Sequence, residues 1–303
     1  MTAFEVHTLD LCFQGAREAI AAYLVMGPAG PVLVETGPGS TVPTLLNELA
    51  RFGVVPADVR DVFLTHIHLD HGGAAGWWAR QGARIHVHHV GAPHIINPEK
   101  LLASAQRIYG DRMQSLWGEY LAVPAEQIDA LEDGAVRRAG GLEFRALDTP
   151  GHARHHMVYQ VGDAGFAGDL AGIRISGRRH VRLPTPPPEF DVDAWLASIE
   201  RVRALRLAHL YLTHFGAVDD VDAHWAEVSA LLRQHTELAR DLLVQGNDRE
   251  AIIAAFQAHE EERRRADDLD PETLKRYAGV GPVVMSVDGL IRYWSKRLPA
   301  MQA

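Results

Sequence analysis

In the first part of the chain, segments with the apolar pattern of strands alternate with a segment that has the pattern of a helix. Residues 4–13 and 20–36 are apolar runs of the kind that forms strands, and a Gly-Pro-Ala-Gly segment inside the second run predicts a hairpin turn. A helical pattern follows at about residues 42–52, and residues 59–65 form another apolar, β-branched strand pattern. This alternation of strands and helices is typical of an α/β protein.

The alternation is interrupted between residues 98 and 133. A strand pattern at residues 83–90 precedes this segment, but inside it the apolar side chains recur at about helical spacing. We therefore predict a helical insertion at residues 98–133. Short strand patterns return after it, at residues 142–147, 157–161 and 209–213.

Beyond about residue 220 the pattern is helical to the end of the sequence. The predicted helices span residues 225–243, 248–264, 271–277 and 287–296. We therefore predict a domain at residues 1–220, which includes the insertion, and a helical C-terminal extension at residues 221–303.

The composition narrows the class of protein. The 303 residues are 47% hydrophobic and 23% charged, a balance typical of a globular protein. The formal net charge of -9 argues against a broad nucleic-acid surface, which needs clustered lysine and arginine. The N-terminus lacks a signal-peptide pattern, and no apolar run reaches the roughly 20 residues of a membrane helix. We expect a cytoplasmic protein that acts on a small molecule and binds neither nucleic acid nor membranes.

The sequence contains a single cysteine, Cys12. An intramolecular disulfide and a thiolate-rich metal site are therefore both excluded. Cys12 falls in the apolar pattern of the first strand, so we expect it to be a buried structural thiol.

Four metal-capable side chains fall within six positions directly after the strand pattern that ends at residue 65: His66, His68, Asp70 and His71. His66 and His68 are two residues apart in an extended segment, so their rings point the same way and can bind one ion. Asp70 and His71 project differently as the chain turns into a helix, which favours a second ion nearby. Imidazole and carboxylate ligands suit Zn²⁺, and also Fe²⁺, Mn²⁺ or Co²⁺.

This stretch resembles the H-x-H-x-D-H signature of the metallo-β-lactamase superfamily. In that family another His, a bridging Asp and a last His follow, each at the end of a later strand. Candidates occur here in the same order: His152 in Thr-Pro-Gly-His, Asp169 in Phe-Ala-Gly-Asp, and His214 in Tyr-Leu-Thr-His. The resemblance covers about residues 5–220.

The resemblance implies a four-layer αββα sandwich of two mixed β-sheets flanked by helices. It also implies two divalent metal ions, with Zn²⁺ favoured over Fe²⁺ or Mn²⁺. The implied ligands are His66, His68 and His152 for one ion, Asp70, His71 and His214 for the other, and Asp169 as the bridge. A hydroxide shared by the two ions would attack a carbonyl carbon, and Asp70 could accept and return a proton. Related proteins usually carry Asp at the position of Glu35, which by resemblance would orient a ligand histidine.

The implied reaction is hydrolysis of an ester, thioester or lactone. The ligand set of only His and Asp and the helical tail resemble glyoxalase II and lactonase-like members most. Lactonase-type members often place a Tyr shortly after the bridging Asp, whereas Leu-Ala-Gly-Ile follows Asp169 here. Two alternatives stay open. A phosphodiesterase or nuclease of the same superfamily is disfavoured by the acidic charge, and an iron-dependent sulfur dioxygenase would need only one metal site.

Other histidines lie close to the motif in the sequence. His86, His88 and His89 fall in the strand pattern of residues 83–90 without an acidic partner nearby in the sequence, so we expect them to be packed or surface residues and not ligands. His155 and His156 follow His152 closely, and we expect them to support the site without binding metal.

The insertion leaves two alternatives open. In this superfamily such insertions often cover the active site, and Tyr109, Trp117 and Tyr120 would then form the aromatic lining of a lid. The same side chains could instead serve plain packing or a contact in a homodimer.

Overall fold

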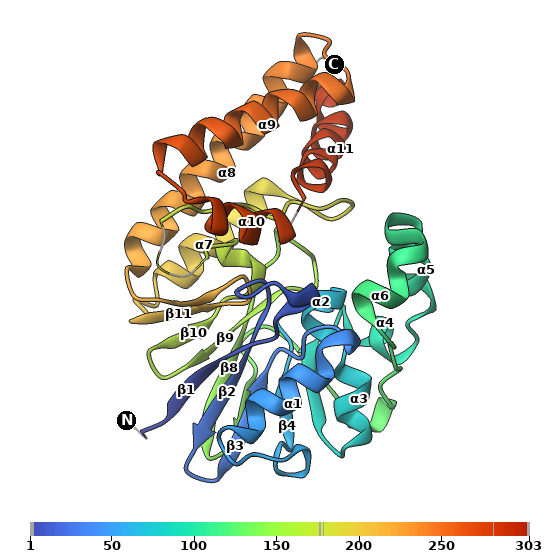
Figure 1. Ribbon diagram of the computed structural model, residues 1–303, viewed down its shortest axis with the longest axis vertical. Helices are drawn as coiled ribbons and strands as arrows, with labels where there is room; N and C mark the ends of the chain where they lie inside the picture. The colour runs from blue at the N-terminus through green and yellow to red at the C-terminus, as the bar shows by residue number, and fades with distance from the viewer. Residues whose placement is uncertain (1–2, 176, 178, 281, 302–303) are drawn as a thin grey trace.

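The computed structural model describes residues 3–175, 177, 179–280 and 282–301. It contains two six-stranded mixed sheets packed face to face (Figure 1). The strands of the first sheet, in spatial order, are β1 (Glu5–Asp10), β2 (Ala21–Gly27), β3 (Gly30–Val34), β4 (Asp61–Phe63), β5 (Arg84–His88) and β6 (Ile128–Leu131). Strands β1 to β3 pair antiparallel, as the predicted hairpin requires, and β3 to β6 pair parallel.

The second sheet is built from the later strands. They are β7 (Val136–Ala139), β8 (Leu142–Asp148), β9 (Met157–Val161), β10 (Ala164–Phe166), β11 (His209–Leu212) and β12 (Gly216–Val218). Their neighbours in space follow the chain order, with β10 and β11 parallel and the other pairs antiparallel. Strand β12 is absent from the predicted elements, because three residues are too few to give a periodic pattern.

Aromatic side chains fill the space between the two sheets. Phe63 of β4 stacks on Phe144 of β8 with 4.2 Å between ring centroids, and Tyr159 of β9 meets Phe63 edge-on at 5.1 Å. The Tyr159 hydroxyl donates to the Leu64 carbonyl at 2.8 Å, so its polar atom is satisfied in this layer. These contacts fix the end of β4 in the first sheet relative to β8 and β9 in the second.

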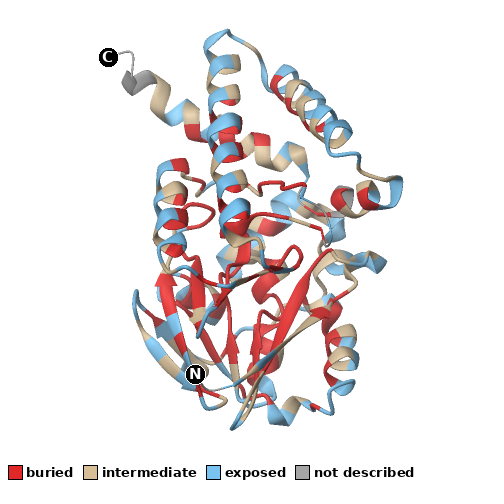
Figure 2. Ribbon diagram, turned by 90° about the vertical axis from the view of Figure 1, so that its left-hand side faces the viewer, coloured by how far each residue is buried: buried red, intermediate tan, exposed pale blue. Residues whose placement is uncertain are grey.

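Helices cover the outer face of each sheet. On the first sheet lie α1 (Val42–Ala50) and α3 (Ala75–Arg80), which bury Leu45 and Trp78 against it. On the second sheet lies α7 (Val192–Arg203), whose Trp195 is fully buried. Figure 2 shows the buried residues concentrated along the strands and on the inner faces of the helices. The order helix, sheet, sheet, helix confirms the expected four-layer αββα sandwich.

Four helices follow the last strand: α8 (Val221–Val244), α9 (Arg249–Ala266), α10 (Pro271–Gly279) and α11 (Val283–Met301). They lie at one end of the molecule, where Figure 1 also places the C-terminus. Trp225 of α8 and Leu290 of α11 belong to the same buried cluster as Trp195 and Leu210. The helical tail is therefore continuous with the core on the outer face of the second sheet. Among the described residues no helix has the length and apolar character that crossing a membrane requires.

The predicted helical insertion at residues 98–133 is only partly helical. Helices α5 (Glu99–Tyr109) and α6 (Met113–Trp117) occupy its first part, after an unpredicted short helix α4 (Ala92–Ile96). Residues 128–131 instead form β6, the edge strand of the first sheet. The prediction was wrong there because the four residues Ile-Asp-Ala-Leu lack a periodic signature, and the parallel partner β5 lies about 40 residues earlier in the chain.

Cys12 also differs from its expected placement. Strand β1 ends at Asp10, whose carboxylate accepts hydrogen bonds from the Cys12 and Glu18 amides at 3.0 and 3.1 Å. These bonds turn the chain before it reaches Cys12, which adopts a left-handed conformation with φ 46°. Cys12 is consequently half-buried in a turn and is not a core thiol of the strand.

Candidate metal centre

The segments that follow four strands meet at one edge of the sandwich. His66 and His68 follow β4, His152 follows β8, Asp169 follows β10, and His214 follows β11. The strands are held rigidly by their hydrogen-bonded neighbours, so the start of each following loop has a fixed position. The tertiary fold therefore gathers residues that are up to about 150 positions apart in the sequence.

A single helical turn, α2 (Leu69–Gly72), carries Asp70 and His71. The turn is closed by the His71 amide, which donates to the His68 carbonyl at 3.0 Å. Gly73 follows directly, and a Cβ there would overlap the Leu69 carbonyl oxygen. Only glycine fits this close approach, which lets the chain enter α3 without moving the turn that carries Asp70 and His71.

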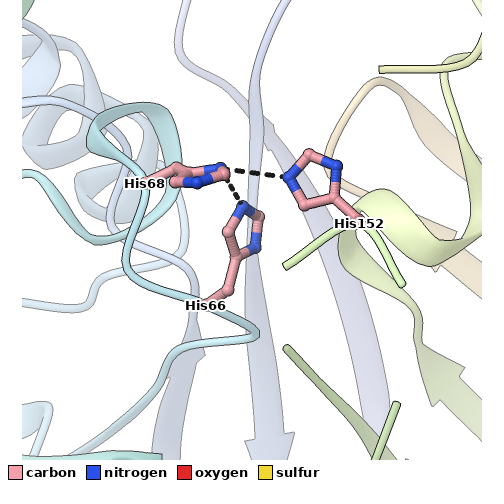
Figure 3. A group of neighbouring side chains, drawn as sticks. All are labelled: His66, His68 and His152. Atoms are coloured by element: carbon pink, nitrogen blue, oxygen red, sulfur yellow. Dashed lines mark hydrogen bonds between the residues drawn. The ribbon is translucent and has the colours of Figure 1, made fainter. Parts of the chain in front are cut away.

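Three histidines form the first donor group (Figure 3). His68 Nδ1 lies 2.9 Å from His66 Nε2 and 3.0 Å from His152 Nε2. His152 Nδ1 donates to the Pro184 carbonyl at 2.8 Å, so its Nε2 presents a lone pair to the group. Burial lowers the pKa of all three imidazoles, that of His68 to about 3, which keeps the rings neutral and able to bind a cation.

Asp70, His71 and His214 form a second donor group. His214 Nε2 lies 3.4 Å and His71 Nε2 3.8 Å from the same carboxylate oxygen, Asp70 Oδ2. His214 Nδ1 donates to the Ala19 carbonyl at 2.7 Å, which turns Nε2 toward Asp70. The Asp70 side chain is 27% exposed, so this side of the site is open to solvent.

Asp169 lies between the two groups. Its Oδ1 is 3.3 Å from His71 Nε2 and 3.5 Å from His214 Nε2, whereas its Oδ2 is 3.3 Å from His152 Nε2. Burial alone would raise the pKa of Asp169, but His71, His152 and His214 hold it well below the usual range. The carboxylate is therefore ionised and presents one oxygen to each group.

Two buried atoms show that the residues fit a metal ion. His71 Nε2 and Asp169 Oδ1 have no hydrogen-bond partner within the described part of the chain, although burying such atoms unpaired is costly. Burial would lower the pKa of His71, yet Asp169, Asp70 and Glu35 raise it well above its usual value. The surrounding carboxylates thus favour a positive charge at this point. Imidazole and carboxylate donors converging in this way suit a divalent metal.

Glu35 supports the second group from behind, as expected. Its Oε1 accepts from His71 Nδ1 at 3.0 Å and from the Thr213 hydroxyl at 3.1 Å, and it also accepts from the Thr65 hydroxyl. The Glu35 side chain is 1% exposed. The hydrogen bond fixes the tautomer of His71, so that Nε2 faces Asp169.

The structure brings all seven sequence-predicted ligands together, six of them in the two groups and Asp169 between the groups. His155 and His156 join neither group among the described residues: His156 Nδ1 instead lies 2.8 Å from the Thr149 hydroxyl, and His155 is buried beside His68. The sequence reasoning missed the supporting roles of Thr65, Thr213 and the Pro184 carbonyl. Each threonine directly precedes a histidine of a donor group, which is a usable signal, but nothing in the sequence marks Pro184.

The histidines of β5 are packed inside the protein, away from the donor groups. His86 is 3% exposed and lies between Asp61 Oδ1 at 2.9 Å and Asp129 Oδ2 at 2.8 Å, while Arg137 Nε donates to Asp129 at 2.6 Å. The acidic partners that are absent nearby in the sequence come from β4 and β6, the strands on either side. Packing, one of the two expected alternatives, is therefore the correct one for His86.

This environment predicts a pH-dependent contribution of His86 to stability. Burial would lower the pKa of His86, but Asp129 and Asp61 raise it above 6.5. The stabilisation is then complete below about pH 6.5 and lost as pH rises through the folded-state pKa. We expect His86→Gln to lower the free energy of unfolding by about 1.5–3 kcal/mol at pH 6 and by less at pH 9, with metal content unchanged.

Denaturant unfolding at the two pH values, with elemental analysis, tests this expectation. His209→Gln is the matched control, because His209 pairs with Asp219 at the surface and is 46% exposed. An equal loss for His86→Gln at both pH values would contradict the charged pairing. Loss of a metal ion would show that the ligands had been assigned wrongly.

The insertion packs against the turn at Phe13 and against the loop that carries Ser40. Trp117 stacks on Phe13 with 5.4 Å between centroids and meets Tyr109 at 5.0 Å. Burial raises the pKa of Tyr109, and the Asp70 carboxylate raises it further. The Ser40 hydroxyl donates to the Leu116 carbonyl at 2.6 Å, so α6 is also attached to the loop that follows Glu35.

Comparisons with known proteins agree with this geometry. Residues 16–214 match the family model described as the metallo-beta-lactamase superfamily. A metallo-beta-lactamase fold-containing protein of Sulfurisphaera tokodaii is 29% identical over 66% of this chain and 74% of its own length. An atrochrysone carboxyl ACP thioesterase of Pseudocercospora fijiensis is 26% identical over 78% of this chain, which spans 63% of that relative. The structure of a metallo-beta-lactamase family protein from Thermus thermophilus superposes with a TM-score of 0.66 at 21% identity, covering 97% of this chain and 93% of the other. The chain therefore belongs to the metallo-beta-lactamase superfamily.

Proposed function

We propose that the protein is a hydrolase that cleaves an ester, thioester or lactone bond of a small molecule. The reaction would use two divalent metal ions, with Zn²⁺ the favoured metal. The single observation that carries this proposal is the placement of Asp169. One oxygen of this buried carboxylate faces His152, and the other faces His71 and His214. A carboxylate shared in this way can hold two cations close together.

The chain's own residues then have distinct tasks. Two bound cations would supply a low-pKa water and polarise a carbonyl oxygen. Asp70 faces the open side of the site as an ionised carboxylate, since His71 and His214 outweigh burial and lower its pKa. It can accept a proton from the attacking water and return it to the leaving group. Glu35 and the Pro184 carbonyl hold His71 and His152 in their orientations.

The names of two relatives support a thioester as the substrate. Two relatives, from Pseudocercospora fijiensis and Aspergillus fumigatus, are named atrochrysone carboxyl ACP thioesterases. Their sequences are 26% and 25% identical to this chain over the matched residues. A glyoxalase II-like reaction on a small thioester agrees with the ligand set of His and Asp. The net charge of -9 supports a small substrate over the nucleic acid of a nuclease.

Metal analysis with a substrate panel tests the proposal. Protein purified without chelator and reconstituted with Zn²⁺, Mn²⁺ or Fe²⁺ should hold close to two equivalents, and it should hydrolyse a thioester, ester or lactone. A content that stays at one equivalent would overturn the dinuclear centre and favour a sulfur dioxygenase, tested by oxygen uptake. Turnover of a phosphodiester alone would favour the phosphodiesterase alternative.

We propose that the insertion acts as a lid and that its aromatic side chains contact the substrate. We expect Trp117→Ala to raise KM or change substrate preference by about tenfold, with metal content unchanged, because it removes the ring that packs against Tyr109 in the proposed lid. Steady-state kinetics across the panel measure this. Unchanged kinetics together with a weakened homodimer in sedimentation would favour the interface alternative.

A further inference from the structure

The carbonyl that orients His152 is held by the C-terminal helix. Ser286 lies on α11, and its hydroxyl contacts the two peptides on either side of Pro184. It donates to the Leu183 carbonyl at 3.1 Å and accepts from the Thr185 amide at 3.4 Å. The Thr185 hydroxyl in turn donates to the Ser286 carbonyl at 2.8 Å. Three hydrogen bonds therefore attach residues 183–185 to one residue of α11.

This attachment fixes the direction of the Pro184 carbonyl. In a trans peptide the carbonyl and the following amide lie in one plane and point in opposite directions. Because the Thr185 amide points at Ser286, the Pro184 carbonyl points away from α11 and toward His152 Nδ1, which donates to it at 2.8 Å. Gly289 lies on the next turn of α11, and a Cβ there would overlap the Thr185 carbonyl oxygen. The helix and the loop are thus in direct backbone contact.

The other side of His152 is held by the sandwich itself. The ring meets Trp195 edge-on, with 5.7 Å between centroids, and the Trp195 indole donates to the Leu170 carbonyl at 2.8 Å. Packing on Trp195 limits where the imidazole can lie, and the hydrogen bond to Pro184 selects which nitrogen faces His68. The orientation of the ring within these limits therefore depends on α11, which holds the Pro184 carbonyl.

We propose that Ser286 is a positioning residue of the metal centre: through the Pro184 carbonyl it orients His152, so that metal affinity at the three-histidine group depends on the C-terminal helices. This inference rests on the proposed metal centre. It assigns to the tail a task in assembling the site, about 70 residues beyond the last ligand in the sequence.

The test is a Co²⁺ titration of the full chain after metal removal, followed by visible absorption and by competition with a chelator. We expect Ser286→Ala to weaken binding at the three-histidine group by about tenfold and to change its Co²⁺ spectrum. Binding at Asp70, His71 and His214 should stay near that of the unmodified chain. Thr185→Val should also weaken Co²⁺ binding at the three-histidine group. Thr185→Ser keeps the hydroxyl and should bind Co²⁺ as tightly as the unmodified chain.

Thr236→Val is the matched control. It likewise removes a hydroxyl from the C-terminal helices, but that hydroxyl donates to the Leu232 carbonyl within α8. If Ser286→Ala does not fold, the two Thr185 variants carry the test. Equal weakening of both ions, unchanged binding, or the same effect from Thr236→Val would overturn the positioning role and leave the metal centre standing. A chain that binds no Co²⁺ before any substitution would overturn both proposals.

Discussion

Asp169→Asn is expected to abolish most of the hydrolytic activity while the fold survives. The substitution keeps the size of a side chain that is 4% exposed and removes its charge. The amide offers one neutral oxygen where two charged oxygens face the two donor groups, so two cations would repel each other with less compensation. The ion at Asp70, His71 and His214 should be lost first. Turnover should fall by at least about a hundredfold.

Circular dichroism, metal content and turnover on one preparation measure this result. Asp163→Asn is the matched control, because Asp163 lies six positions earlier in the exposed turn between β9 and β10. The control should keep both ions and normal turnover. An Asp169→Asn variant with two ions and near-normal turnover would contradict the bridging role of this carboxylate.

Glu35→Leu should cost both stability and metal. The buried carboxylate accepts hydrogen bonds from the Thr65 amide and hydroxyl, the Thr213 hydroxyl and His71 Nδ1. A leucine leaves these groups unpaired in the interior, at about 1–3 kcal/mol each, so the free energy of unfolding should fall by at least about 3 kcal/mol. Without this acceptor the tautomer of His71 is no longer fixed, and its metal ion should weaken as well.

Denaturant unfolding of metal-free protein separates the two effects, because stability is then measured without the ions. Glu35→Gln retains one acceptor oxygen and should be intermediate in both stability and metal content, which keeps the test valid if the leucine variant does not fold. Glu48→Leu is the control, since Glu48 pairs with Arg51 at the surface and should change stability by about 0.5 kcal/mol or less. A Glu35→Leu variant as stable as the control would refute the supporting role.

Several features of the protein follow from the sequence alone. The strand and helix patterns give most elements because burying one face requires local periodicity in the chain. The motif from His66 to His71 is also local, since its four candidate ligands lie within six positions and share one turn. The later candidate ligands His152, Asp169 and His214 could be proposed only by resemblance, because nothing in the sequence around each of them requires a metal.

Only the tertiary structure decided the rest. Strand β6 exists because β5 offers it a parallel edge, and His86 is packed because Asp61 and Asp129 lie on the strands beside it. The hydroxyl of Ser286 is hydrogen-bonded to backbone atoms of residues 183–185, about a hundred positions away, and such bonds carry no sequence signature. Hydrogen bonds to backbone atoms and pairs across strands depend on which segments the fold brings together. A local sequence pattern predicts only which face of a segment is buried, and it does not predict which residues pack against that face.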